Sequence, residues 1–314
     1  MADTANNQQA FPQQSAQKHG LGFPIARIVG LISLSTGSIG SYAKGPYQGK
    51  GSGETSLLSV LFEDISDNDL LLADRYYCTW TIFALILKQN SHFLVQNHAQ
   101  RKPNFSEGKK LGAKDHIVSW KKPKKQPVWM ADEDYQSLPE EIVIREFSLG
   151  GIVYVTTLLD VKRYPKRELA ALHKERWLIE LDFRSIKTNM RMEMLRCKSA
   201  DRVKKEIAVH FLSYNLIRAN MARSAVMNQK TPRQNSFMTA VQLFNEIKIQ
   251  LILQSGNILN HIVKSSLDSM ASIVTGKQKR KNQPRAIKRR PKSYPLLTKP
   301  RSEACEAINK GGFA

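Results

Sequence analysis

The chain of 314 residues is long enough for one large domain or two smaller ones, each with a substantial hydrophobic core. It has 48 Lys and Arg against 27 Asp and Glu, a formal net charge of +21. This excess predicts an anionic partner, most commonly nucleic acid, although ribosome-like and membrane-surface proteins share the balance. The three cysteines are far apart in the sequence. Their spacing argues against a zinc site or a disulfide framework and indicates a reducing compartment.

The first residues, Met1–Gly22, are polar and predict a loop. Ile25–Ser35 is an apolar run rich in β-branched residues, which predicts a buried strand, and a shorter strand is expected at Ser38–Ala43. The apolar run is too short to cross a membrane and is interrupted by Arg27. No signal peptide is visible, so we expect a soluble, cytoplasmic protein that is not associated with a membrane.

Helices and strands are expected to alternate in the next stretch. In chain order the pattern predicts a helix at Glu54–Ile65, a strand at Asp69–Asp74, a helix at Tyr76–Lys88 and a strand at His92–Val95. Such alternation predicts a mixed α/β sheet.

The segment Arg101–Lys125 is basic and punctuated by Gly and Pro, which indicates mostly loop. Short strand-like runs follow at His116–Trp120, Pro127–Met130, Ile142–Phe147 and Ile152–Leu158. These runs predict a β-rich insertion, residues 99–158, inside an α/β core made of residues 1–98 and 159–200.

Helical periodicity returns after the insertion. We expect helices at Lys166–Met192, Arg202–Met227 and Thr239–Leu253, and a further one to about Ile273. Residues 201–276 would then form a C-terminal helical region.

A basic tail, residues 277–314, ends the chain. Lys277–Arg301 contains eleven Lys and Arg and no acidic residue, which predicts disorder. A nonspecific grip on phosphates, with Lys288, Arg289 and Arg290 among the contacts, is the preferred interpretation. A tail that only keeps the protein soluble is the alternative.

The helix predicted at Lys166–Met192 carries a polar strip. His173, Arg176, Glu180 and Lys187 fall within about 60° of helical arc. Beside them lies an apolar strip that would pack on the core: Leu172, Ile179, Phe183, Ile186 and Met190. The strip places a carboxylate among cations, which suits a metal and a phosphate. An ordinary solvated Arg–Glu pair is the alternative.

Asp74 stands where an apolar strand ends. A carboxylate at the carboxyl end of a strand in an open α/β sheet faces the ligand crevice. An N-cap of the following helix explains Asp74 equally well. Together with Glu180 it could hold Mg²⁺, and two metals would support an in-line phosphoryl displacement, for which a third carboxylate is generally needed.

These residues carry a family resemblance. Asp74 in Leu-Leu-Leu-Ala-Asp-Arg-Tyr-Tyr, with Arg176, Glu180 and Lys187 at their spacing, resembles bacterial DDE transposases of insertion-sequence family four, whose signature is Tyr-(2)-Arg-(3)-Glu-(6)-Lys. The similarity runs from about residue 8 to 301. It includes the short motifs Gln9–Pro12, Gly20–Pro24 and Lys288–Lys292.

The resemblance implies a ribonuclease-H-like core with a β-rich insertion before the glutamate helix. It implies that Asp74 and Glu180 are catalytic metal ligands for Mg²⁺ or Mn²⁺, and that Arg176 and Lys187 contact DNA phosphates. His173 stands where the family has Tyr, and its imidazole could still donate to a phosphate. The implied activity is DNA transposition by two-metal cutting and rejoining at insertion-sequence ends, with DNA and a homodimer or a heterodimer as partners.

The family's first catalytic acid precedes a segment like Met1–Thr4, and Asp3 resembles a residue after it. We therefore expect an N-terminally truncated and impaired transposase. The alternative from another class is a non-catalytic DNA-binding fragment that inhibits a full-length partner. A third interpretation is an unrelated basic structural protein.

Overall fold

A computed structural model describes residues 1–49, 51–273 and 297–311. The chain forms two compact units. The first, called the sheet unit, comprises Arg27–Gly45 and Gly49–Arg184. The second, called the helical unit, comprises Met1–Ala26, Pro46–Gln48 and Ser185–Ala314.

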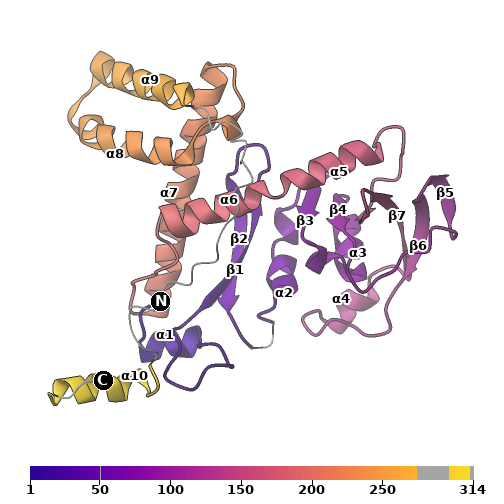
Figure 1. Ribbon diagram of the computed structural model, residues 1–314, viewed down its shortest axis with the longest axis horizontal. Helices are drawn as coiled ribbons and strands as arrows, with labels where there is room; N and C mark the ends of the chain where they lie inside the picture. The colour runs from indigo at the N-terminus through magenta and orange to yellow at the C-terminus, as the bar shows by residue number, and fades with distance from the viewer. Residues whose placement is uncertain (50, 274–296, 312–314) are drawn as a thin grey trace, which may run out of the picture. The chain divides into compact units, whose positions relative to one another are not determined.

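A six-stranded sheet forms the centre of the sheet unit (Figure 1). In spatial order its strands are β3 (Leu70–Ala73), β4 (His92–Gln96), β8 (Ile152–Thr156), β7 (Glu141–Leu149), β6 (Asp115–Lys121) and β5 (Lys109–Gly112). β3 pairs with β4 in parallel, and every later pair is antiparallel. A mixed sheet with helices confirms the predicted α/β class and is consistent with a ribonuclease-H-like transposase fold.

Helices cover both faces of this sheet because its strands alternate their side chains. On β4, Phe93 and Val95 face the core beneath α3 (Trp80–Lys88). Leu94 faces the opposite core, beneath α5 (Lys166–Glu175). Strand β4 is therefore buried on both faces, between two helices.

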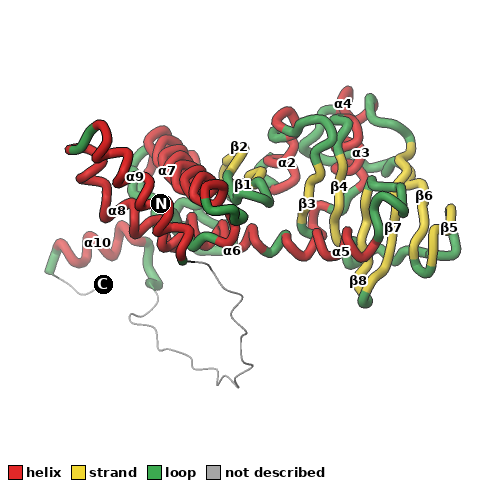
Figure 2. The backbone as a smooth tube through the Cα atoms, turned by 90° about the horizontal axis from the view of Figure 1, so that it is seen from above, coloured by secondary structure: helices red, strands yellow, loops and turns green. Residues whose placement is uncertain are grey.

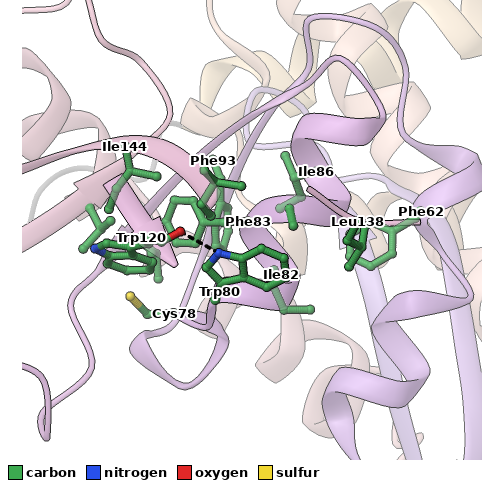
Figure 3. Packing of buried hydrophobic residues seen from close by; sticks show 14 of the residues in the cluster. Phe62, Cys78, Trp80, Ile82, Phe83, Ile86, Phe93, Trp120, Leu138 and Ile144 are labelled. Atoms are coloured by element: carbon green, nitrogen blue, oxygen red, sulfur yellow. Dashed lines mark hydrogen bonds between the residues drawn. The ribbon is translucent and has the colours of Figure 1, made fainter. Parts of the chain in front are cut away.

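The core under α3 is rich in aromatic rings (Figure 3). Phe83 meets Phe93 edge to face, with ring centroids 4.9 Å apart. The indole of Trp80 donates a hydrogen bond to the backbone carbonyl of Trp120 at 2.9 Å (Figure 3). Both contacts attach α3 to the sheet, the second through the insertion strand β6.

The residues before β3 form a smaller layer. Strands β1 (Ala26–Ile32) and β2 (Ile39–Pro46) make a two-stranded sheet, followed by α2 (Glu54–Ser59) and a short 3₁₀ helix at Phe62–Asp64. The two predicted strands are present, but β1, which was predicted to be buried, is half-buried along its whole length. The helix predicted at Glu54–Ile65 is confirmed, in two pieces.

Other predictions in the sheet unit were wrong. Pro127–Met130 is a loop, in which Trp129 and Met130 pack against the core without strand pairing. Strand β5 and helix α4 (Asp132–Gln136) were not predicted.

The segment predicted as an insertion within the core, residues 99–158, contributes β5 to β8 to the central sheet. Strand β4 of the core pairs directly with β8, and β7, β6 and β5 extend the same sheet. The two compact units therefore follow other boundaries than those expected from composition.

Three long helices dominate the helical unit: α7 (Ala200–Met227), α8 (Phe237–Leu253) and α9 (Gly256–Ser272). A 3₁₀ turn at Pro232–Gln234 joins the first two. All three long helices confirm sequence predictions. None of the helices in the described part of the chain is both long enough and apolar enough to span a bilayer.

The two ends of the described chain meet in this unit. Helix α1 (Ala5–Ala10) lies where a loop was predicted, and α10 (Arg301–Asn309) lies where a disordered tail was predicted. The guanidinium of Arg301 pairs with Asp3 and donates to the carbonyl of Leu21 at 2.8 Å. These contacts give the end of the predicted tail a defined place.

Candidate active site

Asp74 follows directly after β3, at the carboxyl end of that strand. Its Oδ1 accepts a hydrogen bond from the backbone N–H of Arg75 at 2.6 Å and so caps the 3₁₀ helix Arg75–Tyr77. The side chain is nevertheless exposed. Asp74 therefore ends a strand and also caps the next helix, as both interpretations stated. The two are compatible because the cap uses only Oδ1 and the carboxylate stays open to solvent.

His173 lies next to that strand end. It is buried on α5, and its Nε2 is 3.3 Å from the backbone carbonyl of Ala73. A ring nitrogen facing a carbonyl must donate, so Nε2 carries the proton. The ring also meets Tyr154 edge to face at 5.3 Å. His173 therefore joins helix α5 to the residue that precedes Asp74.

Burial lowers the pKa of His173 below its ordinary value. The Ala73 carbonyl and the nearby charge of Asp74 act against this, and the charge of Arg176 reinforces it. The neutral imidazole is the favoured form at neutral pH. The prediction that His173 contacts a DNA phosphate stays a prediction, because its observed polar partner is backbone.

The helix that carries the predicted strip is irregular. Helix α5 ends at Glu175, α6 spans Leu178–Arg184, and a π-helical segment covers Ser185–Asn189. At the first break the backbone N–H of Arg176 bonds to the carbonyl of His173 at 3.1 Å, a three-residue step. The prediction of one regular α-helix was wrong, so the arc calculated at constant twist does not apply.

The buried face also differs from the predicted apolar strip. Leu169, Ala170 and His173 are the buried residues of α5, and Asp182 is the buried residue of α6. Of the predicted strip, Ile186 is buried as expected, whereas Phe183 is 39% exposed.

Arg176 and Glu180 are close together across this break. Nη2 of Arg176 is 3.8 Å from Oε1 of Glu180, a loose i,i+4 ion pair. The Glu180 side chain is 70% exposed and the Arg176 side chain 26% exposed. A pair so open contributes little to stability, so the Glu180 carboxylate is available to another cation.

Of the remaining predicted site residues, the structure describes only Lys187. Lys187 is exposed within the π-helical segment, in the helical unit. Lys288, Arg289 and Arg290 lie outside the described residues. Contacts place His173 beside Ala73, the residue before Asp74, and Arg176 beside Glu180. The grouping of Asp74 with Glu180 stays a prediction.

The chemistry of the donors fits a hard divalent cation. Asp74 and Glu180 offer carboxylate oxygens that are open to solvent, which suits Mg²⁺ because it retains several of its waters. Within the described residues, no group of three or more His, Cys, Asp or Glu side chains is arranged to hold a metal. The two carboxylates are thus candidate ligands that would each share a cation with water or DNA oxygens.

Asp3 has a different environment. Its carboxylate pairs with Arg301 and accepts a hydrogen bond from Gln8 Nε2 at 2.8 Å. Burial opposes ionisation, but these two partners lower the pKa of Asp3. Asp3 therefore connects the N-terminal segment to α10.

A comparison with protein families matches residues 4–216 to the transposase DDE domain. The chain belongs to the DDE transposase family. It is 28% identical over 307 residues to the transposase InsG for insertion sequence element IS4 of Escherichia coli strain K12. That match covers 95% of this chain and 67% of the relative. The resemblance to the IS4 group is therefore confirmed.

DDE transposases act in DNA transposition, with divalent metal ions and phosphodiester cleavage as their chemistry. In this transposase the assignment of Asp74 and Glu180 as site carboxylates stays a prediction from the sequence, which missed the contact between His173 and Ala73. The sequence contained one signal for this contact, because Leu169, Ala170 and His173 recur at helical intervals and so share one face of the helix. The apolar type of the first two residues marked the buried face.

Proposed function

We propose that this transposase cuts and rejoins phosphodiesters at insertion-sequence ends, with Asp74 and Glu180 as its metal-binding carboxylates. The observation that carries the proposal is the position of Asp74: an exposed carboxylate at the end of β3, next to the His173 contact of the helix that leads to Glu180. The proposal includes two-metal catalysis with Mg²⁺ or Mn²⁺.

Bound metal would activate water and stabilise the oxygen that leaves the phosphorus. The chain's own residues would position the DNA. Arg176 is close enough to Glu180 to pair with it, so it can exchange that partner for a phosphate oxygen beside the carboxylate. His173 keeps α5 attached at Ala73, which fixes the start of the segment carrying both residues.

Nicking of a supercoiled plasmid in Mg²⁺ or Mn²⁺ tests the proposal. Glu180→Gln should reduce nicking by about 100-fold or more, because a ligand carboxylate contributes several kcal/mol to the transition state. Asp74→Asn should act alike, and DNA affinity should change less than about twofold. Glu175→Gln, an exposed carboxylate five residues earlier, is the matched control and should nick normally. Unchanged nicking in Glu180→Gln would overturn the assignment.

A second candidate function is DNA binding without catalysis, with inhibition of a complete transposase as its effect. It is favoured by the lack of a three-ligand metal group among the described residues. Wild-type protein that binds DNA but does not nick it in either metal, and that lowers nicking when mixed with a complete relative, would support this function over the first.

The DNA partner, association with another copy and a place at the bacterial nucleoid belong to the same proposal. Lys187, Lys288, Arg289 and Arg290 are proposed phosphate contacts. Replacing the last three by Gln should weaken DNA binding and reduce its salt dependence by about 0.9 per lost phosphate contact.

A further inference from the structure

Six basic residues cluster at the β5 edge of the sheet unit, away from Asp74 and Glu180. They come from the β5–β6 hairpin and from the loop and first turn of α5. They are Lys110, Lys114, Lys162, Arg163, Lys166 and Arg167, here called the basic surface. All except Lys166 are exposed, and Lys166 is half-buried.

Hydrogen bonds hold the two segments together although they are about fifty residues apart. The ammonium group of Lys166 donates to the carbonyl of Ala113 at 2.7 Å. Ala113 directly precedes Lys114, so these two lysines are neighbours. Figure 2 shows the N-terminal part of α5 reaching the strands of the insertion.

A buried arginine forms hydrogen bonds to both of these segments. Arg145 on β7 has no exposed area and pairs with Asp115 through Nε at 2.8 Å and Nη2 at 2.7 Å. Its Nη1 donates to the carbonyl of Tyr164 at 2.7 Å. Asp115 follows Lys114 and Tyr164 follows Arg163, so one guanidinium positions a cation from each segment.

Acidic side chains do little to neutralise this surface. Asp115 is buried and already paired with Arg145. Asp160 accepts the backbone N–H groups of Lys162 and Arg163 at 2.8 and 3.1 Å, and Glu168 is the other exposed acid of the segment. Like charges held close together repel one another, so an anionic partner would stabilise the arrangement.

Helix α5 relates this surface to the candidate active site. From Lys166 to His173 the helix rises about 10 Å, since each residue adds about 1.5 Å. Successive phosphates on a DNA strand are separated by about 3.4 Å along the axis. One duplex lying along α5 could therefore extend from the basic surface past His173, a distance of about three base pairs, toward the candidate active site.

We propose that the basic surface binds the backbone of the same duplex DNA that is cut at the candidate active site, at a position along α5 from it. The surface is defined by Lys and Arg side chains, which bind phosphates, so we expect it to position the DNA backbone and not to read bases. This inference rests on the proposed function and adds a second contact region for the same DNA.

The test compares two triple variants of the full chain by their DNA affinity at several salt concentrations. Lys110→Gln, Lys114→Asn and Arg167→Gln remove three cations of the basic surface; Asn is chosen because Lys114 has a positive φ of 51°. The matched control replaces Lys121, Lys124 and Lys125 by Gln, which are exposed and lie at or beyond the other end of β6. The probe is a 30-base-pair duplex without other ligands.

The basic-surface variant should lose about two to three units of salt slope, at about 0.9 per phosphate contact, while the control keeps the wild-type slope. Equal loss in both variants would overturn the inference, because the effect would then follow net charge alone. An unchanged slope in the basic-surface variant would also overturn it.

Lysine acylation of the wild-type protein gives a second measurement that needs no variant. Added duplex should protect Lys110 and Lys114 from reaction and leave Lys124 and Lys125 reactive. Protection of neither pair while the duplex is bound would overturn the inference. Nicking that still depends on Glu180 in that case would leave the proposed function intact, whereas nicking insensitive to Glu180 would count against the function itself.

Discussion

Nε2 of His173 lies 3.3 Å from the backbone carbonyl of Ala73, the residue before Asp74. The two residues are 100 positions apart, and their contact joins a helix to the end of a strand. In this role the N–H of the neutral imidazole stabilises the fold. Protonation of His173 and substitution of His173 should therefore each change the stability.

The first prediction concerns pH. Burial lowers the pKa of His173 in the folded chain, so the unfolded chain binds the proton more tightly. Stability from the neutral ring is complete above the ordinary pKa of about 6.5 and is lost as pH falls toward the folded value. Urea unfolding of wild type and His173→Gln at pH 7.5 and pH 5 should show wild type losing more stability. Gln keeps an N–H donor but does not titrate.

His173→Phe provides the contrast. It keeps a ring beside Tyr154 but leaves the Ala73 carbonyl without this donor, which should cost about 1–2 kcal/mol at pH 7.5. Parallel pH curves for wild type and His173→Gln would show that the ring does not titrate in this window.

The second prediction concerns the buried ion pair of Arg145 and Asp115. Arg145→Met should destabilise the sheet unit by about 3–5 kcal/mol, because it leaves the Asp115 carboxylate buried without its partner. Adding Asp115→Leu should recover part of that loss. Unfolding in urea measures both, and the exposed Lys121→Met on β6 serves as the control. Arg145→Met with wild-type stability would mean that water reaches Asp115.

The third prediction concerns the start of α7. The carboxylate of Glu206 accepts backbone N–H groups from Arg196 at 2.9 Å and from Cys197 at 3.0 Å. Burial alone would raise the pKa of Glu206, but these hydrogen bonds outweigh it and lower the pKa. The stability they provide is present above the unfolded pKa near 4.5 and is lost as pH falls through the lower folded value.

Glu206→Gln should therefore cost about 1–2 kcal/mol at pH 7 and flatten the acid branch of the stability curve. Thermal melting between pH 3 and pH 7 measures this change. Glu193→Gln, an exposed carboxylate in the loop before α7, should melt like wild type throughout. A constant difference between Glu206→Gln and wild type across that range would contradict the linkage.

The sequence predicted the elements whose burial pattern is simple. The continuous apolar run of β4 and the apolar face of α3 are visible because both are packed on a core. β5 was missed because its Lys109 and Lys110 are exposed and carry no alternation. The loop at Pro127–Met130 was mistaken for a strand because it is rich in apolar residues, of which Trp129 and Met130 pack on the core whereas Val128 is exposed.

The sequence predicted the secondary-structure positions of the two candidate carboxylates. Asp74 and Glu180 were found as acids at a strand end and on a helix. The change of helical twist between Glu175 and Leu178 was not, because no Gly or Pro lies there to mark it. A strip calculated at 3.6 residues per turn loses its meaning across a 3₁₀ step and a π-helical segment.

The contact between Asp3 and Arg301 joins residues 298 positions apart. At about 5–20 residues per second, a ribosome needs roughly 15–60 s to synthesise the chain between them. During that time the N-terminal segment exists without α10, and Asp3 has no guanidinium to pair with. Slower translation, or a fusion that delays the docking of α10, would therefore lengthen the time during which the N-terminal segment lacks its contact with Arg301.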